Sequence, residues 1–151
     1  MIMRLKIYIL TLCCILSSAC HAGERNNANM QNPMKVKAIC GTHQAVIVLE
    51  DNATAKDFVS ILPVTVKMEE IHGREKYGDI PRNLTEKDQR VKTYEVGEFV
   101  YWDKGPGIAV FYRQGNNEIS AGIIRMGHIE SGIELFETPN DIEVRFELIV
   151  E

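Results

Sequence analysis

The spacing of apolar residues from Lys35 onward is typical of a chain that is mostly β-structure. The segments Lys35–Cys40 and Gln44–Glu50 alternate and are separated by the turn Gly41-Thr42-His43, which predicts a hairpin. Further strands are expected over Val64–Glu69, in a hairpin over Glu98–Arg113, and over Glu118–Ile129. The last strand is the most regular, and its core-facing residues are predicted to be Ile142, Val144, Phe146, Leu148 and Val150.

One segment changes to the helical period. Its apolar residues are spaced i, i+3, i+4 and i+7 and form a single stripe of Ala55, Phe58, Val59 and Leu62. Thr54 and Asp57 resemble a capping box at the start of this helix, and Pro63 is expected to end it. The helix is short and amphipathic, so we expect it to cover an open end or a face of the sheet.

These elements together predict a mainly β fold. The polar region Glu70–Glu95 is expected to add one or two short strands and a surface loop around Thr85–Arg90, and Ile133–Phe136 a single helical turn. Seven or eight short strands with one clear helix favour a closed or nearly closed antiparallel barrel, because closure leaves no strand edge unpaired.

The first residues differ from the rest of the chain. Arg4 and Lys6 precede an uncharged run over Ile7–Ala19, which is typical of an export signal and too short for a spanning helix of ~20 apolar residues. The sequence Leu16-Ser17-Ser18-Ala19-Cys20 resembles a bacterial lipoprotein signal with Cys20 as the lipidated residue. Cleavage after Ala22, a retained membrane anchor and a misplaced start are the alternatives.

This interpretation divides the chain into three parts and gives its location. Residues 1–19 are predicted to be a signal peptide, residues 20–34 a disordered tether and residues 35–151 the barrel domain. The protein is expected to be exported to the periplasm or cell envelope. A lipid on Cys20 would attach it to a membrane.

Charge and cysteine content narrow the possible partners. The formal net charge is −4, and it becomes −6 if the two cations Arg4 and Lys6 leave with the signal. This balance argues against nucleic acid as a partner, because a phosphate backbone requires a basic surface. Cys13 and Cys14 would leave as well, so Cys40 is expected to be a small core residue, with a bridge to Cys20 or a reactive thiol as the alternatives.

Familiar catalytic and metal-binding motifs are missing from the sequence. His43, His72 and His128 stand alone, with no second ligand at metal-binding spacing, so no metal site is predicted. There is no phosphate loop, nucleophile motif or dinucleotide fingerprint, and Gly105-Pro106-Gly107 is turn chemistry. We therefore expect no cofactor, and we assign no catalytic residue.

Several segments resemble, in order, the bacterial and archaeal group of proteins with a cyclophilin-like fold. The late segment MGHIESGIELF (Met126–Phe136) resembles a cyclophilin strand that runs into a glycine and a short helix. The matching motifs are Glu75-Lys76, Pro81-Arg82-Asn83-Leu84, Gly97 to Trp102 and Gly122-Ile123-Ile124. The resemblance covers about Lys35 to Val150 and implies a closed eight-stranded antiparallel barrel with one or two capping helices.

The resemblance also raises the question of prolyl isomerase activity. Cyclophilins use an Arg in a Phe-His-Arg motif, a Phe, a Gln in a Gln-Gly-Gly run, and a later Trp or His. This sequence has neither motif, and Phe111 alone corresponds to a site aromatic. It is therefore open whether the protein is an enzyme. The hypotheses are a domain that binds a peptide or small ligand, an atypical isomerase, and a non-catalytic lipoprotein that docks a partner.

Four residues are the candidates for ligand binding. Tyr101 and Trp102 must point to opposite faces of their strand, as must Phe111 and Tyr112, so one member of each pair is predicted to face outward. Arg82 is the cation proposed beside the pocket, with Arg113 and Arg125 as alternatives, or a surface residue paired with Asp79 or Glu86. Glu75-Lys76-Tyr77 is expected to line a pocket or to form an exposed strand edge. The predicted ligand-binding set is Arg82, Tyr101, Trp102 and Phe111.

Overall fold

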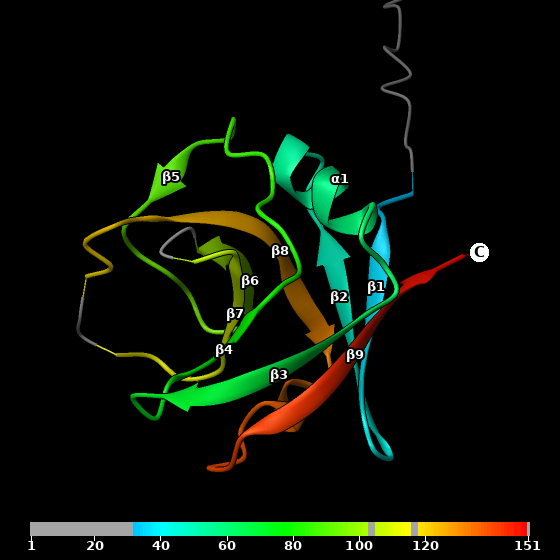
Figure 1. The fold of residues 1–151 in the computed structure, drawn as a ribbon. Coiled ribbons are helices and arrows are strands. Elements are labelled where there is room, and N and C mark those ends of the chain that lie inside the picture. Colours follow the sequence, from blue (N-terminus) through cyan, green and yellow to red (C-terminus); the bar gives the residue numbers. More distant parts are fainter. Residues whose placement is uncertain (1–31, 103–104, 116–117, 151) are drawn as a thin grey trace, which may run out of the picture. The chain divides into compact units, whose positions relative to one another are not determined.

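The computed structural model describes residues 32–102, 105–115 and 118–150 (Figure 1). The elements are β1 (Lys35–Cys40), β2 (His43–Leu49), α1 (Ala53–Val59), β3 (Val64–Ile71), β4 (Glu75–Asp79), β5 (Arg90–Val91), β6 (Glu98–Trp102), β7 (Gly107–Phe111), β8 (Ile123–Ser131), the 3₁₀ turn η1 (Ile133–Leu135) and β9 (Ile142–Ile149). The predicted signal, the lipidation site Cys20 and residues 20–31 of the predicted tether lie outside the described residues. The end of the predicted tether is described, and Met34 is tied to the barrel, because its carbonyl accepts a hydrogen bond of 2.8 Å from the Leu49 amide.

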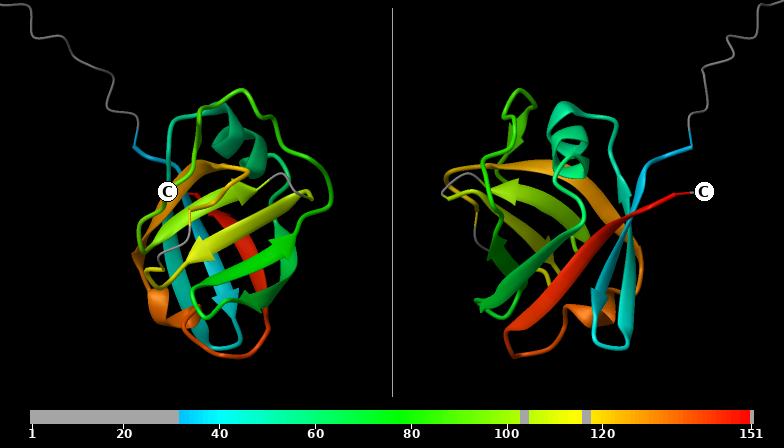
Figure 2. Two further views of the ribbon diagram at one scale, coloured as in Figure 1. Left: turned by 90° about the vertical axis from the view of Figure 1, so that its left-hand side faces the viewer. Right: turned by 45° about the vertical axis from the view of Figure 1, so that its right-hand side comes forward.

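Eight of these strands close into an antiparallel barrel, which confirms the predicted fold class. The order of neighbours is β2-β1-β9-β3-β4-β7-β6-β8, and pairing of β2 with β8 completes the circle. The extra strand β5 adds to β8 outside the circle through Arg90 and Val91. Figure 2 shows the closed wall and α1 at one end of it.

Alternation along the strands fills the barrel interior. Phe99 and Tyr101 point inward from β6, and Val110 points inward from β7 with Tyr112 just after it. Phe58 of α1 enters the same core and meets Phe99 at 5.1 Å between ring centroids. The helix therefore covers the end of the barrel, as expected. Cys40 is a free cysteine, partly buried against this core.

Strand β9 corrects the predicted inward face of the last strand. Val144 and Phe146 are fully buried, whereas Leu148 is 39% exposed and Val150 is 85% exposed. The register explains the difference, because Phe146 pairs with Val64 at the start of β3, and β9 continues beyond that partner. The apolar–polar alternation of the sequence therefore continues through Leu148 and Val150, although the interior of the barrel ends before them.

The start of α1 also differs from the prediction. Asn52, not Thr54, is the N-cap, and its side-chain oxygen accepts a hydrogen bond of 2.8 Å from the Ala55 amide. Thr54 lies inside the first turn, where its hydroxyl donates to the Thr85 carbonyl and to Asp88. Within the described part of the chain, no helix has the length and apolar character needed to cross a membrane.

Strand β4 is a central strand, which corrects the prediction of an exposed edge. It pairs with β3 on one side and β7 on the other. Lys76 points into the end of the barrel away from α1 and is fully buried. Its ammonium donates to Glu70 Oε2 at 2.6 Å and to the carbonyls of Thr138 and Asn140 at 2.5 and 2.7 Å. Tyr112 donates to the other oxygen of Glu70 at 2.7 Å, so this polar network closes that end.

Candidate functional site

A second apolar cluster lies on the outside of the barrel, against β6, β7 and β8. Its strand residues alternate with the interior ones, since Val100 lies between Phe99 and Tyr101, and Phe111 between Val110 and Tyr112. Two segments cover these strands and contribute one buried residue each: Tyr94 from the segment before β6 and Ile119 from the segment before β8. We call this set the outer cluster: Tyr94, Val100, Ala109, Phe111, Ile119 and Ile123.

An arginine lies on the aromatic part of the outer cluster. The rings of Tyr94 and Phe111 stack, with centroids 3.8 Å apart and planes 14° apart. The guanidinium carbon of Arg74 lies 5.4 Å from the centroid of Tyr94 and 5.9 Å from that of Phe111. This is a cation–π arrangement. An Nη atom of Arg74 also contacts the Glu75 carboxylate at 3.3 Å.

Tyr77 and Trp102 form a second aromatic pair beside the cluster. Their centroids are 5.9 Å apart and their planes cross at 87°. Both side chains are partly exposed. Gly107 lies beneath the Tyr77 ring, because a Cβ at that position would overlap the ring. The Tyr77 hydroxyl donates to Asp79 at 2.8 Å, and burial together with this bond raises its pKa. A hollow of about 260 Å³, lined by Lys67, Glu69, Tyr77, Gly78 and Asp79, adjoins the pair.

Two carboxylates lie on this outer surface, one fully buried and one partly buried. Glu75 pairs with Phe111 across β4 and β7, so both side chains leave the same side of the sheet. Glu75 is fully buried, and burial raises its pKa although Arg74 opposes the effect. Glu98 on β6 is paired with Arg125 at 2.5 Å, yet burial still raises its pKa. Both groups are thus favoured in their neutral form relative to an exposed glutamate.

Buried polar atoms without partners are concentrated on this side of the barrel. Among the described residues, the atoms that lack a hydrogen-bond partner include Glu75 Oε2, Glu98 Oε2, Tyr94 Oη and Trp102 Nε1. Leaving such an atom buried and unpaired costs about 1–3 kcal/mol, and such atoms are few in native proteins. The set contains two acceptors, one donor and one hydroxyl that can act as either. The residues described show no group of three or more side chains suited to hold a metal ion.

The structure separates the four predicted ligand-binding residues. Trp102 and Phe111 face outward and Tyr101 and Tyr112 face inward, as the alternation predicted for one member of each pair. Tyr101 is fully buried in the barrel interior, where its hydroxyl accepts from the Leu84 amide at 3.3 Å. Phe111 is fully buried within the outer cluster. Of the four, Trp102 is at the partly exposed pair and Phe111 lies beneath the covering segments.

Arg82 lies elsewhere, beside α1. Its guanidinium donates to both oxygens of Asp57 at 2.6 and 3.2 Å, and to Ser60 and the Asn83 carbonyl. The alternative of a surface ion pair fits these contacts, but its partner is Asp57 and not Asp79 or Glu86. Thr85 donates to the same carboxylate, so Arg82 and Asp57 fix the loop after β4 to the helix. A ligand-binding role for Arg82 stays a prediction.

Sequence reasoning missed the residues that complete the site. Arg74 follows a tight turn at His72 and Gly73, both with positive φ, and nothing in its local pattern relates it to Phe111. Tyr94 lies in a polar stretch without periodicity. The available signal was the alternation of Glu75, Tyr77 and Asp79, which places three polar-tipped side chains on one face of β4.

The comparisons agree with the observed fold. The model of the cyclophilin-like family matches residues 38–147. The solution structure of a hypothetical protein from Archaeoglobus fulgidus is similar, with a TM-score of 0.63 and 14% sequence identity, over 80% of this chain and 98% of that one. At this identity the likeness concerns the fold alone. The search of curated proteins gives no match. Because the family model covers most of the barrel, from the middle of β1 into the last part of β9, the chain belongs to the cyclophilin-like family.

Proposed function

We propose that the protein is an exported, lipid-anchored domain that binds a peptide or a small amide-bearing ligand at the outer cluster. The observation that carries this proposal is the set of unpartnered buried polar atoms on one outer face of the barrel, which extends from Glu75 and Glu98 to Trp102 of the partly exposed Tyr77–Trp102 pair. A peptide offers N–H groups to the carboxylates of Glu75 and Glu98, and a carbonyl to the indole N–H of Trp102. The aromatic rings supply apolar contact area with a polar tip.

Tryptophan fluorescence tests ligand binding directly. The chain contains one Trp, so its emission reports on Trp102 alone. Titration with a blocked Ala-Pro-Ala peptide is expected to change the emission with saturation. Glu75→Gln should weaken the binding, whereas Arg82→Ala, which lies beside α1, should bind as the unaltered protein does. A titration with no response, or equal weakening by both variants, would favour the partner-docking lipoprotein instead.

Arg74 supports prolyl isomerisation as the second candidate function. The barrier to rotation of about 18–20 kcal/mol arises from amide resonance. A cation beside an apolar surface lowers it by donating to the proline nitrogen as conjugation is lost, while the surface removes water from the amide. Arg74 has this setting over Tyr94 and Phe111, and Arg82 does not. An isomerisation assay should therefore lose activity in Arg74→Ala and keep it in Arg82→Ala. No activity in the unaltered protein would exclude this candidate.

Export and lipidation rest on the sequence before Gly23. Mass spectrometry of the protein purified from a bacterial host is expected to find Cys20 as the first residue, carrying acyl chains. An unmodified chain that starts at Gly23 would refute the lipid anchor, and a chain that retains Met1 would refute cleavage of the signal.

A further inference from the structure

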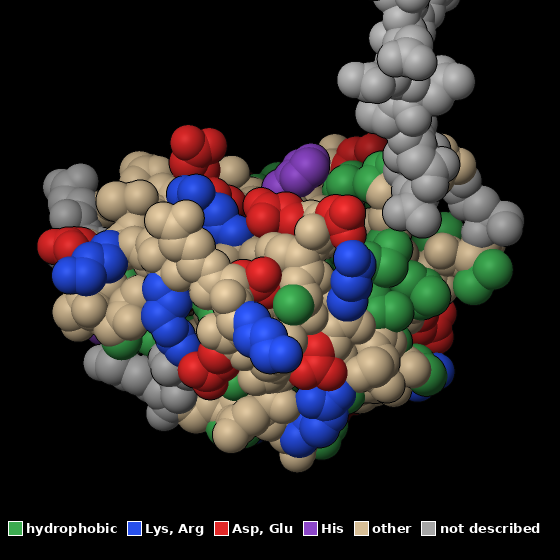
Figure 3. Space-filling view, turned by 90° about the horizontal axis from the view of Figure 1, so that it is seen from above, with side chains coloured by type: hydrophobic (Ala, Val, Ile, Leu, Met, Phe, Trp, Pro, Cys, Tyr) green, Lys and Arg blue, Asp and Glu red, His purple; other side chains and the backbone are tan. Residues whose placement is uncertain are grey.

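The described residues include an apolar surface that the barrel does not cover. Leu148 of β9 and Val150, which follows the strand, continue the inward alternation beyond the end of the interior and are 39% and 85% exposed. Met34, which precedes β1, and Leu62 and Pro63, which follow α1, complete the surface. We call Met34, Leu62, Pro63, Leu148 and Val150 the end patch. Figure 3 shows hydrophobic side chains gathered at one margin of the α1 end.

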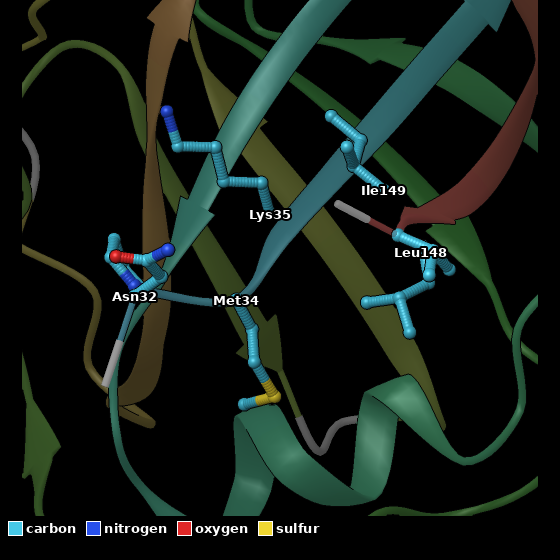
Figure 4. Close-up of a pocket in the computed structure, with 7 residues that line it drawn as sticks. Asn32, Met34, Lys35, Leu148 and Ile149 are labelled. Atoms are coloured by element: carbon cyan, nitrogen blue, oxygen red, sulfur yellow. The ribbon is translucent and has the colours of Figure 1, made fainter.

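Two shallow hollows meet at Leu148 within the end patch. One, of about 280 Å³, is lined mainly by Pro33, Met34, Leu148 and Val150. The other, of about 290 Å³, lies between Leu62, Pro63 and Leu148. Figure 4 shows Met34 and Leu148 reaching the first hollow from the start of β1 and the end of β9. The two hollows therefore form one uneven, mainly apolar surface, with Lys35 and Glu147 at its margin.

The nearby charges are neutralised in pairs. Lys35 Nζ lies 2.9 Å from a Glu130 carboxylate oxygen, and Lys37 Nζ lies 3.8 Å from Glu147. Such a surface suits a partner whose contacting face is also apolar and carries no strong charge. A nucleic acid or a strongly anionic protein does not have this chemistry.

The chain itself indicates what the patch meets. Asn32, the first described residue, lines the first hollow. About 12 residue steps separate it from Cys20, and a flexible chain of that length would span about 20 Å on average. A lipid on Cys20 would thus hold the end patch within one short segment of the bilayer. Apolar side chains placed there insert into the boundary between headgroups and acyl chains.

We propose that the end patch docks on the phospholipid bilayer. This rests on the lipid anchor of the proposed function. Docking would fix the orientation of the domain on the membrane. It would also leave the outer cluster uncovered, because that cluster lies on the barrel wall at β7, which is four strands away from β1 in either direction around the circle. The outer cluster then stays accessible to ligands in the surrounding compartment.

Site-specific depth measurement tests the docking. The full chain is expressed with its signal in a bacterial host, purified, and reconstituted in phosphatidylcholine vesicles that contain brominated lipid. Val150→Cys in a Cys40→Ser background carries an environment-sensitive dye. The matched control is Val96→Cys, because Val96 is also an exposed apolar residue, 48% exposed, and precedes β6. The dye at position 150 is expected to lose about half of its emission to bromolipid, since interfacial side chains reach about 5–10 Å into the boundary. The dye at position 96 should lose little, and Leu148→Glu should abolish the loss at position 150.

Each other result counts against the proposal. A lipidated protein whose two dyes are quenched equally, or not at all, refutes docking and leaves the anchor intact. Self-quenching of the dye at position 150 that grows with protein concentration, without an effect of bromolipid, would show that a second copy covers the patch. Protein without lipid on Cys20 that stays in the supernatant would refute the anchor, and the docking with it.

Discussion

Replacing Lys76 by methionine should destabilise the barrel more than any exposed lysine substitution. Methionine keeps most of the apolar length of the side chain and removes the ammonium. The ammonium is fully buried and makes three contacts, with Glu70 Oε2 and with the carbonyls of Thr138 and Asn140. The turn between η1 and β9 would lose both of its bonds to β4.

The size of the effect follows from what is left behind. Breaking a fully buried ion pair costs about 3–5 kcal/mol, and each buried acceptor without a donor about 1–3 kcal/mol. Glu70 keeps the hydrogen bond from Tyr112, and its side chain is 18% exposed. Both features reduce the cost of leaving its charge without the Lys76 ammonium. We therefore expect a loss of about 3 kcal/mol in the free energy of unfolding at neutral pH.

The loss should depend on pH. Burial acts to raise the pKa of Glu70, but the bonds from Lys76 and Tyr112 outweigh it and lower the pKa below the ordinary value of 4.5. The stability that comes from this carboxylate is present above pH 4.5 and disappears as pH falls through its lowered pKa. The difference between Lys76→Met and the unaltered protein should therefore shrink in acid.

Urea denaturation followed by circular dichroism measures this loss. Lys92→Met is the matched control, because Lys92 has a 61% exposed side chain and a surface partner 3.5 Å away in Glu118. Its effect should stay below about 0.5 kcal/mol. An Lys76→Met variant as stable as Lys92→Met, or one whose deficit is the same at acidic and neutral pH, would refute the reasoning.

Three further predictions concern the rest of the domain. Burial raises the pKa of Glu75 despite the adjacent Arg74, so the contribution of Glu75 to the free energy of unfolding is present below pH 4.5 and is lost as pH rises. Glu75→Gln should therefore gain stability relative to the unaltered protein between acidic and neutral pH. A constant difference between the two proteins in urea denaturation would contradict this. A hydrogen bond from Arg82 lowers the pKa of Asp57 from 3.8 to about 2, so Asp57→Asn should be less stable than the unaltered protein at neutral pH. Thermal melts should show this deficit shrink as pH falls from 3.8 through about 2, and a deficit as large at pH 2 as at neutral pH would count against the ion pair. Gly107→Ala should displace the Tyr77 ring and change the tryptophan emission, whereas Gly105→Ala, where an added Cβ meets the Tyr77 hydroxyl at an ordinary 3.4 Å, should not; identical spectra would mean that Tyr77 does not lie over Gly107.

The strands could be predicted because their alternation is local. The hairpin of β1 and β2, the strand β9 and the opposite faces of Tyr101 and Trp102 all follow from the two-residue period. The end of a strand's buried region could not be predicted in this way. Leu148 continues the pattern, but its burial depends on how far the neighbouring strand β3 extends.

The candidate site depends on contacts between residues far apart in the sequence. Lys76 resembles an edge residue in isolation, and its burial requires carbonyls 62 and 64 residues away. Arg82 was a reasonable candidate cation, but Asp57 is 25 residues earlier and satisfies it. Arg74 reaches Phe111 only because β4 pairs with β7.

The central claim is that the outer surface around Trp102 binds a ligand, and the indole N–H of Trp102 tests it most directly. The chain has one Trp, so a nitrogen-15 correlation spectrum contains a single indole resonance. In this structure the indole nitrogen is buried without a partner. Adding the blocked Ala-Pro-Ala peptide should shift this resonance to the position of a hydrogen-bonded indole, and Glu75→Gln should require more peptide for the same shift. A resonance that stays fixed while amide signals move elsewhere on the barrel would contradict the account.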